Sequence, residues 1–196
     1  MRSNGASGDI AAFVWVVKEH DRGLRTLAYR LLGDGEVMDD VMQDAYLRAF
    51  RALSGFRGDS AARSWLYRIV YNACMDRLRS DQRRREVSLE ALVETADGGA
   101  DRPAACRATQ VTAWSAACAV DDPGESVVRR SELASALALL PADQRATVLL
   151  VDAMGLAHAE AAQVLGVRPG TVASRLHYAR STLRATLRGG RTHETV

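Results

Sequence analysis

Apolar residues recur at the spacing of an α-helix in two separate parts of this chain, and this pattern constrains the fold more than any other feature. The first part runs from Ile10 to about Arg85 and the second from Val128 to about Leu187. The expected core residues of the second part are Leu139, Leu140, Val148, Leu149, Leu150, Leu156, Val164 and Leu165. Such spacing puts apolar side chains on one helix face, which must be buried against another element. Strand-like alternation does not stand out in the sequence, so we expect an all-α protein with two small helical domains.

The segment between the two parts has a different composition. Residues 86–127 hold many glycine, proline, aspartate and threonine residues with little periodicity, which is typical of a linker. The sequence therefore predicts a first domain of about four helices at 1–85, a long and mostly irregular linker at 86–129, a second domain at 130–188 and a tail at 189–196. One short helix is expected in the linker, near residues 111–119.

Charge follows the same division. Residues 1–85 carry 15 basic and 11 acidic residues, residues 86–126 carry 2 and 8, and residues 127–196 carry 9 and 5. The net charges of the three segments are thus +4, −6 and +4. Two basic blocks joined by an acidic one indicate two anion-binding modules and a linker whose partner is not nucleic acid.

The composition also excludes several classes of protein. The chain is 47% apolar and 26% charged, and no apolar run approaches the roughly 20 residues of a membrane span. Its start lacks the pattern of a signal peptide, so we expect a cytoplasmic protein with no membrane partner. The four histidines show no nucleophile or metal-ligand spacing, so neither an enzyme nor a cofactor is expected.

Three cysteines, Cys74, Cys106 and Cys118, form no CxxC pair. An odd number without paired spacing argues against a disulfide framework and against a four-ligand zinc site. Incidental reduced thiols are the favoured interpretation, with a redox role as the less favoured one.

The run from His158 to Leu176 has the features of a helix-turn-helix. Ala162 is small enough for two helices to cross, and Gly166 follows in the turn, where a positive φ favours glycine. Pro169 suits the first turn of the second helix, because its missing N–H has no intrahelical partner there.

The second helix of this run is predicted to have one apolar face and one polar face. Its apolar face consists of Val172, Leu176, Ala179 and Leu183. Its opposite face consists of Ser174, His177, Tyr178, Ser181 and Arg184, flanked by Arg175 and Arg180. Hydroxyls, rings and arginines suit a helix in the major groove of DNA. A solvated surface helix and a protein-binding helix remain alternatives.

A helix from about Ser64 to Arg79 mixes arginines with aromatic rings. Leu66, Ile69, Val70 and Ala73 are predicted to face the core, and Arg68, Asn72, Met75 and Arg79 the opposite side. With Trp65, Tyr67 and Tyr71 nearby, the pattern suits single-stranded DNA, because cations follow the backbone and rings stack on bases. The alternative is that Trp65 and Tyr71 are ordinary core residues.

Two further features flank this helix. The glycine-bearing loop before it, SGFRGDSAAR, could form a pocket for one unstacked base, with Asp59 or Ser60 reading its polar edge. The preceding helix, residues 36–51, directs Val37, Val41, Ala45 and Phe50 toward the core in our prediction and leaves an acidic face. That face favours docking of a basic protein, with an ordinary solvated surface as the alternative.

Three stretches in this order resemble the extracytoplasmic-function sigma factors of RNA polymerase, in particular the actinobacterial members of the sigma-70 family. They are DDVMQDAYLRAFRAL, FRGDSAARSWLYRIVYNACMDRLR and LPADQRATVLLVDAMGLAHAEAAQVLGVRPGTVASRLHYAR. The resemblance implies a transcription initiation factor that consists of the second and fourth sigma domains. It covers residues 10–85 and 130–188.

The resemblance also assigns residues to partners. The surface that docks on the clamp helices of the largest core polymerase subunit would comprise Asp39, Asp40, Gln43, Asp44, Leu47 and Arg48. Contacts with the minus-10 element, including a flipped base and the unwound strand, would come from Phe56, Arg57, Gly58, Asp59, Ser60, Ala61, Trp65, Arg68 and Asn72. Duplex contacts with the minus-35 element would come from Thr171, Ser174, Arg175, His177, Tyr178 and Arg180.

The same resemblance implies the polymerase flap region as a further contact and a linker path through the RNA-exit region. It leaves an anti-sigma factor open as another partner. Two departures from the family pattern stand out. Ala173 replaces a usual lysine or arginine, which removes one expected DNA contact, and Ala157 and Ala159 replace a serine and a glutamate. Loss of the N-cap at Ala157 is expected to weaken the first helix by about 1 kcal/mol.

The competing hypothesis is a stand-alone helix-turn-helix regulator that binds a palindrome as a dimer without polymerase. That hypothesis leaves the acidic helix and the aromatic helix without a role, so the sequence disfavours it.

Overall fold

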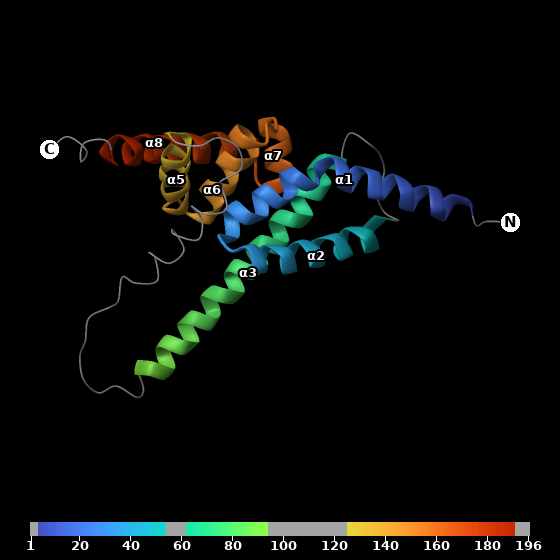
Figure 1. The fold of residues 1–196 in the computed structure, drawn as a ribbon, viewed down its shortest axis with the longest axis horizontal. Coiled ribbons are helices and arrows are strands. Elements are labelled where there is room, and N and C mark those ends of the chain that lie inside the picture. The colour runs from blue at the N-terminus through green and yellow to red at the C-terminus, as the bar shows by residue number, and fades with distance from the viewer. Residues whose placement is uncertain (1–3, 54–61, 94–124, 191–196) are drawn as a thin grey trace.

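The structure is a computed structural model that describes residues 4–53, 62–93 and 125–190. Within these ranges it contains helices and no strand, which confirms the all-α prediction. An N-terminal unit comprises α1 (Asn4–Leu32), α2 (Gly35–Ala52) and α3 (Ala62–Val93). A C-terminal unit comprises α5 (Glu125–Ala138), α6 (Ala142–Val148), the π-helical turn η3 (Leu149–Ala153), α7 (His158–Leu165) and α8 (Pro169–Gly190). Figure 1 shows the two units side by side.

A tight turn sets α2 against α1. Gly33 has a φ of 76°, a conformation that costs glycine little. Asp34 then caps α2, and its carboxylate accepts hydrogen bonds from the N–H groups of Glu36 (2.9 Å) and Val37 (3.1 Å). This cap fixes where α2 begins and therefore which of its faces is buried.

The core of the N-terminal unit is formed where the three helices meet. Its fully buried side chains include Leu24, Leu27 and Leu31 of α1, Met42 and Ala45 of α2, and Leu66 and Val70 of α3. Gly23 lets α3 approach α1 closely, because a Cβ at this position would lie 2.2 Å from the hydroxyl oxygen of Tyr67. The tyrosine therefore occupies the space that any larger residue would need.

The C-terminal unit contains the predicted helix-turn-helix. Gly166 ends α7 in the left-handed region (φ 66°, ψ 32°), and Pro169 begins α8. Val172, Leu176, Ala179 and Leu183 are all buried, as the sequence predicts. The polar face of α8 is exposed, so the expected turn and the expected faces of α8 are both confirmed.

Several sequence predictions about burial are wrong. Leu139, expected in the core, is 55% exposed, and Phe50 is 49% exposed. Met75 is buried although we predicted it on the polar side of its helix. Periodicity fails at these residues because α3 has neighbours on more than one side and because some apolar residues face open grooves.

Helical structure extends into both ends of the segment predicted as the linker. α3 continues to Val93, beyond the expected boundary at residue 85, and α5 begins at Glu125. Of the four helices expected in the first domain, the described residues show α1, α2 and α3. The short helix expected at 111–119 lies outside the described residues.

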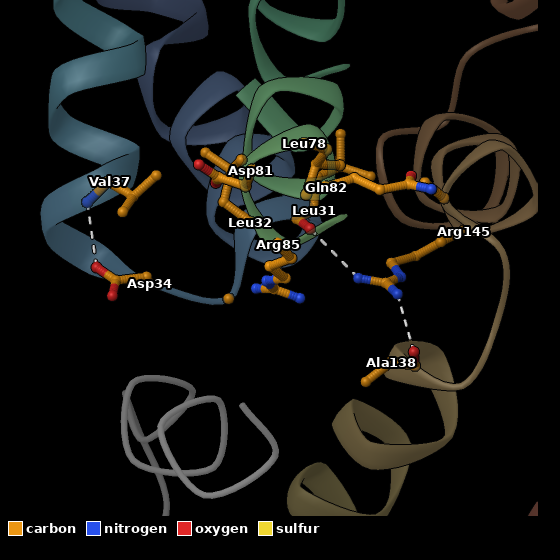
Figure 2. A pocket seen from close by; sticks show the side chains of 12 residues that line it. Leu31, Leu32, Asp34, Val37, Leu78, Asp81, Gln82, Arg85, Ala138 and Arg145 are labelled. Atoms are coloured by element: carbon orange, nitrogen blue, oxygen red, sulfur yellow. Dashed lines mark hydrogen bonds between the residues drawn. The ribbon is translucent and has the colours of Figure 1, made fainter. Parts of the chain in front are cut away.

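The two units pack directly on one another. α3 contacts α7, and α1 contacts α6. Arg145 of α6 connects three chain segments, because its guanidinium donates to the carbonyls of Leu31 (3.3 Å), Ala138 (2.9 Å) and Leu140 (3.1 Å). Burial lowers the pKa of this guanidinium. Figure 2 shows Arg145 and Arg85 beside a cavity of about 470 Å³ at this junction.

Candidate nucleic-acid and protein interfaces

The exposed face of α8 presents polar groups to solvent. Ser174, His177 and Tyr178 are exposed, and the rings of His177 and Tyr178 meet edge to face with their centroids 5.8 Å apart. Tyr178 is 64% exposed, an unusual position for a ring without a partner surface. The face projects from a helix held rigidly by its buried ridge, which is the arrangement needed to present side chains to the edges of bases.

The two arginines beside this face are held in place by aspartates. Arg175 donates to Asp143 of α6 at 2.8 Å. Arg180 contacts both carboxylate oxygens of Asp152 through its Nε and Nη2 atoms. Each guanidinium has five N–H donors in a planar fork, so the atoms that do not face the aspartate can still reach a phosphate. No local pattern marks Asp143 or Asp152 as a partner, because both lie 28 or more positions away from the arginine they bind.

A groove on the N-terminal unit brings together three of the residues expected to contact the unwound strand. Its volume is about 330 Å³, and it is lined by Arg48, Ala52, Trp65, Arg68, Ile69 and Asn72. Trp65 is half-buried at its edge, whereas Arg68 and Asn72 are exposed. A ring, a cation and an amide in one groove can stack on a base, pair with a phosphate and donate a hydrogen bond.

Tyr67 and Tyr71 do not belong to this groove. Both are buried, with 3% and 6% of their surface exposed, so the interpretation of Tyr71 as a core residue is the correct one. Burial, reinforced by the carboxylate of Asp143, raises the pKa of Tyr71 to about 12. Tyr67 packs beside Gly23 and under the guanidinium of Arg63. Both tyrosines therefore serve packing rather than stacking on bases.

The loop expected to capture a flipped base, residues 56–61, lies outside the described residues. Phe56, Arg57, Gly58, Asp59, Ser60 and Ala61 therefore keep the role that the sequence predicts for them. Trp65 stands one turn into α3, so this helix begins close to the groove.

The acidic face of α2 is exposed throughout. It consists of Asp39, Asp40, Gln43, Asp44, Leu47 and Arg48. Arg25 of α1 binds Asp39 at 2.6 Å, and Arg48 binds Asp44 at 2.7 Å and Asp76 of α3 at 3.3 Å. Among the described residues, Asp40 has no ion-pair partner within 4 Å. The face therefore combines one uncompensated carboxylate with an exposed leucine.

An apolar groove lies between α5 and the end of α8. It has a volume of about 250 Å³ and is lined by Ser131, Glu132, Ser135, Ala136, Leu139, Thr186 and Leu187. The exposed Leu139 is part of its wall, so the failed core prediction at this residue has a structural reason. An exposed apolar groove of this kind is typical of a protein-binding site.

None of the described helices combines the length and apolar character needed to cross a lipid bilayer.

Two family profiles match the two units of the fold. Residues 16–84 match the family described as Sigma-70 region 2, and residues 130–183 match the family described as Sigma-70, region 4. The first match spans most of α1 to α3, and the second spans the C-terminal unit up to Leu183.

Curated relatives match nearly the whole chain. The ECF RNA polymerase sigma factor SigM of Mycobacterium tuberculosis is 39% identical over 177 residues, which cover 90% of this chain and 78% of the relative. The ECF RNA polymerase sigma-E factor of Escherichia coli is 31% identical, with 90% and 86% covered.

Solved structures share the fold. CnrH in complex with the cytosolic domain of CnrY has a TM-score of 0.62 and 28% identity, with 94% of this chain and 92% of that chain covered. The sigma factor RpoE in complex with the anti-sigma factor NepR from Bartonella quintana also has a TM-score of 0.62, at 24% identity, with 91% and 95% covered.

Proposed function

Since this chain belongs to the extracytoplasmic-function sigma factors of the sigma-70 family, which direct RNA polymerase to promoters, we propose that its two units divide the work. The N-terminal unit docks on core polymerase and holds the unwound minus-10 strand. The C-terminal unit reads the minus-35 duplex. The observation that carries this division is the contrast between the Trp65 groove and the exposed polar face of α8.

The acidic face of α2 supplies the main contact with core polymerase. Asp40 carries the charge that is not neutralised within the described part of the chain, and Leu47 beside it adds apolar area. Such a face selects a basic helical surface, for which the clamp helices of the largest subunit are the proposed partner. Arg25 and Arg48 hold Asp39 and Asp44 in fixed orientations, so this surface is organised before binding.

The minus-10 strand follows the groove at the start of α3. Arg68 meets the phosphate backbone, Asn72 donates to a base or sugar, and Trp65 stacks on a base. Residues 56–61 hold the flipped base at the same end of the helix. Opening the duplex costs a few kcal/mol per unstacked base, and stacking with a pocket recovers that cost without catalysis.

The helix α8 lies in the major groove of the minus-35 duplex. Thr171, Ser174, His177 and Tyr178 reach the base edges, while Arg175 and Arg180 meet phosphates. Because Ala173 offers no cation, the phosphate contacts depend on these two arginines, and each is oriented by its aspartate.

The groove between α5 and α8 fits the flap of the polymerase. An amphipathic helix of the partner would cover Leu139 and Leu187, which removes exposed apolar surface from water. An anti-sigma factor is a further proposed partner, because the sigma factor RpoE, which shares this fold, was solved in complex with the anti-sigma factor NepR. We place this work in the cytoplasm, where promoter and polymerase are found.

Run-off transcription tests the proposal directly. Core polymerase is incubated with a fragmented genomic library, with and without the protein, and new start sites are mapped. We expect starts that share a pair of upstream elements, and we expect Asn72→Ala to abolish most of them while it still binds core polymerase.

The opposite outcome supports the other class of protein. If no new starts appear and the protein alone shifts palindromic duplexes, it acts as a stand-alone regulator. That alternative is not favoured by the family membership, and it leaves the acidic face of α2 without a partner.

A further inference from the structure

The cavity at the junction of the two units has the size of a small-molecule site. Figure 2 shows it between the end of α1, the start of α2, the later part of α3 and α6, with the last residue of α5 beside it. Its volume of about 470 Å³ lies within the range of about 300–1,000 Å³ that is usual for ligand pockets. The described residues assigned to DNA or to polymerase lie outside it. The cavity is therefore a feature that the promoter and polymerase contacts do not use.

α3 supplies one wall of this cavity from a single face. Four residues at the i, i+3, i+4, i+7 spacing lie side by side along that face: Leu78, Asp81, Gln82 and Arg85. The amide of Gln82 is oriented by Glu86, whose carboxylate accepts a hydrogen bond from its Nε2 atom at 2.9 Å. The amide oxygen and one N–H of Gln82 are left for a ligand.

The charged groups of the cavity differ in how far they are compensated. Asp81 accepts a hydrogen bond from the Nε atom of Arg77 at 3.0 Å, and Asp34 accepts from two backbone N–H groups at the start of α2. Arg85 is exposed and has no ion-pair partner within 4 Å in the described part of the chain. Because the carboxylates already have donors, the five N–H donors of Arg85 are available to an anion.

A second guanidinium lines the same cavity from α6. Hydrogen bonds to three backbone carbonyls hold Arg145, so its orientation is fixed before a ligand arrives. Burial lowers the pKa of Arg145 because desolvation disfavours its charge, and an anion beside it would offset that effect. Figure 2 shows the guanidinium groups of Arg85 and Arg145 at this cavity, one from each unit. Two planar guanidinium groups at one site suit a phosphoryl group, which accepts bidentate hydrogen bonds.

Much of the remaining wall is apolar. Leu31 and Leu32 end α1, Val37 lies in the first turn of α2, and Leu78 lies on α3. A bare inorganic anion gains nothing from such a wall, whereas a flat organic ring removes it from water. The combination therefore favours a ligand that carries both phosphate and a ring.

We propose that this cavity is a binding site for a nucleotide, whose phosphates pair with Arg85 and Arg145 and whose base packs on the apolar wall. The amide of Gln82 offers a donor and an acceptor to the polar edge of the base. A free nucleotide fits the cavity better than a nucleic-acid strand, because a strand needs an open groove that follows its backbone. The site goes beyond the promoter and polymerase contacts and does not depend on them.

Isothermal titration calorimetry of the full-length protein with ADP and with GDP tests the site. We expect at least one of the two to bind with a dissociation constant below about 1 mM. Arg85→Gln should weaken that binding about tenfold, because it removes a charge-assisted pair with phosphate. The matched control is Arg84→Gln, which makes the same change at the next position of α3, outside the cavity, and should bind like the wild type.

A second variant tests the space itself and leaves both arginines in place. Ala142 at the start of α6 lines the cavity, so the larger side chain of Ala142→Leu occupies room that the ligand needs. This variant should also weaken binding of the nucleotide, with the helix content of the wild type by circular dichroism. Full affinity in Ala142→Leu would place the nucleotide elsewhere and overturn the proposal.

Inorganic pyrophosphate and the matching nucleoside separate the two halves of the ligand. Each should bind at least about tenfold more weakly than the nucleotide, because it uses only the cations or only the apolar wall. The proposal is overturned if neither nucleotide binds at about 1 mM, or if pyrophosphate or the nucleoside binds as tightly as the nucleotide. Equal losses in Arg85→Gln and Arg84→Gln would indicate a general attraction of α3 for anions and would overturn it too. Transcription does not enter these measurements, so their failure is distinct from failure of the proposed function.

Discussion

α3 and α8 are the two helices proposed to contact DNA, and they use their surfaces differently. α8 buries one ridge, from Val172 to Leu183, and exposes the rest of its middle section. α3 is enclosed on two sides. Leu66 and Val70 face the core of its own unit, whereas Tyr67 and Tyr71 lie on the side nearer the C-terminal unit. A narrow strip with Arg68 and Asn72 is left for DNA.

The difference matches the two forms of DNA that the helices are expected to meet. A helix in the major groove needs a broad polar face for base edges and phosphates. A single strand needs only a cation and one ring, because its bases are already accessible. The narrow strip on α3 is therefore sufficient for an unwound strand, while it would be a poor surface for a duplex.

The largest expected effect comes from Trp65→Ala, which removes the ring that lines the groove beside Arg68 and Asn72. Stacking of a base on an aromatic side chain contributes about 1–3 kcal/mol, so open-complex formation should fall roughly 5-fold to 150-fold. Permanganate footprinting of the melted region measures open-complex formation.

Binding of the same variant to core polymerase should be nearly unchanged, and Trp65→Phe, which keeps a ring, should retain most of the melting. Equal losses in melting and in core binding would show that Trp65 has a structural role only.

A second prediction tests the claim that the tyrosines of α3 are packing residues. Gly23→Ala puts a methyl group 2.2 Å from the Tyr67 hydroxyl, and overpacking of this kind costs about 1–3 kcal/mol. Alanine gains up to about 1 kcal/mol over glycine inside a helix, so a net loss near 1 kcal/mol is expected. Chemical denaturation of the full chain measures the free energy of unfolding.

The sign of this effect should reverse in a Tyr67→Phe background. Without the hydroxyl, the nearest ring carbon lies 3.5 Å from the new methyl group, an ordinary contact. Gly23→Ala should then stabilise the protein relative to Tyr67→Phe alone. A loss of the same size in both backgrounds would mean that the hydroxyl of Tyr67 is not the obstacle.

Sequence periodicity predicts both faces of α8 but only part of the burial of α3, for a physical reason. α8 has one buried side, so a single apolar stripe describes it, and Gly166 and Pro169 mark the turn by their backbone requirements. α3 is buried on two sides, and its second partner is supplied by residues some 70 or more positions away. Nothing local to Tyr71 reveals that partner, so its burial could not be derived from spacing.

The exposed apolar residues show a second limit of periodicity, because it predicts burial for residues that are exposed. Phe50 and Leu139 fit an apolar stripe, yet both are exposed; Leu139 lines a groove, and Phe50 packs edge to face on Phe13. Periodicity shows that a helix face is apolar. It does not show whether the surface that covers this face belongs to the same chain. The acidic face of α2 was predictable, in contrast, because charges rarely point inward without a partner.

A smaller effect is expected from Arg180→Gln on α8. Asp152 holds the Nε and Nη2 atoms of Arg180, which leaves Nη1 free to meet a phosphate. Loss of one phosphate contact should reduce the salt slope of promoter binding by about 1, with a similar loss of affinity on different minus-35 sequences.

Titration of holoenzyme binding against salt measures the slope, and Arg77→Gln on α3 serves as the control because its guanidinium binds Asp81. An unchanged salt slope for Arg180→Gln would mean that the guanidinium of Arg180 binds only Asp152 and makes no phosphate contact. The polar face of α8 would then rely on Arg175 for its phosphate contact.

The smallest effect concerns the beginning of α7, where the two units differ in how their helices start. Asp34 caps α2 with its side chain, whereas Ala157 at the start of α7 has no side-chain acceptor. Half of a capping box survives, because Glu160 accepts a hydrogen bond from the N–H of Ala157 at 2.8 Å. Ala157→Ser should complete the box and raise the free energy of unfolding of the C-terminal unit by about 0.5–1 kcal/mol. The wild type is the matched control, since Ala157 carries no hydroxyl, whereas glycine would itself be a better N-cap than alanine. Equal stabilities of Ala157→Ser and the wild type would mean that Glu160 alone already satisfies this helix end.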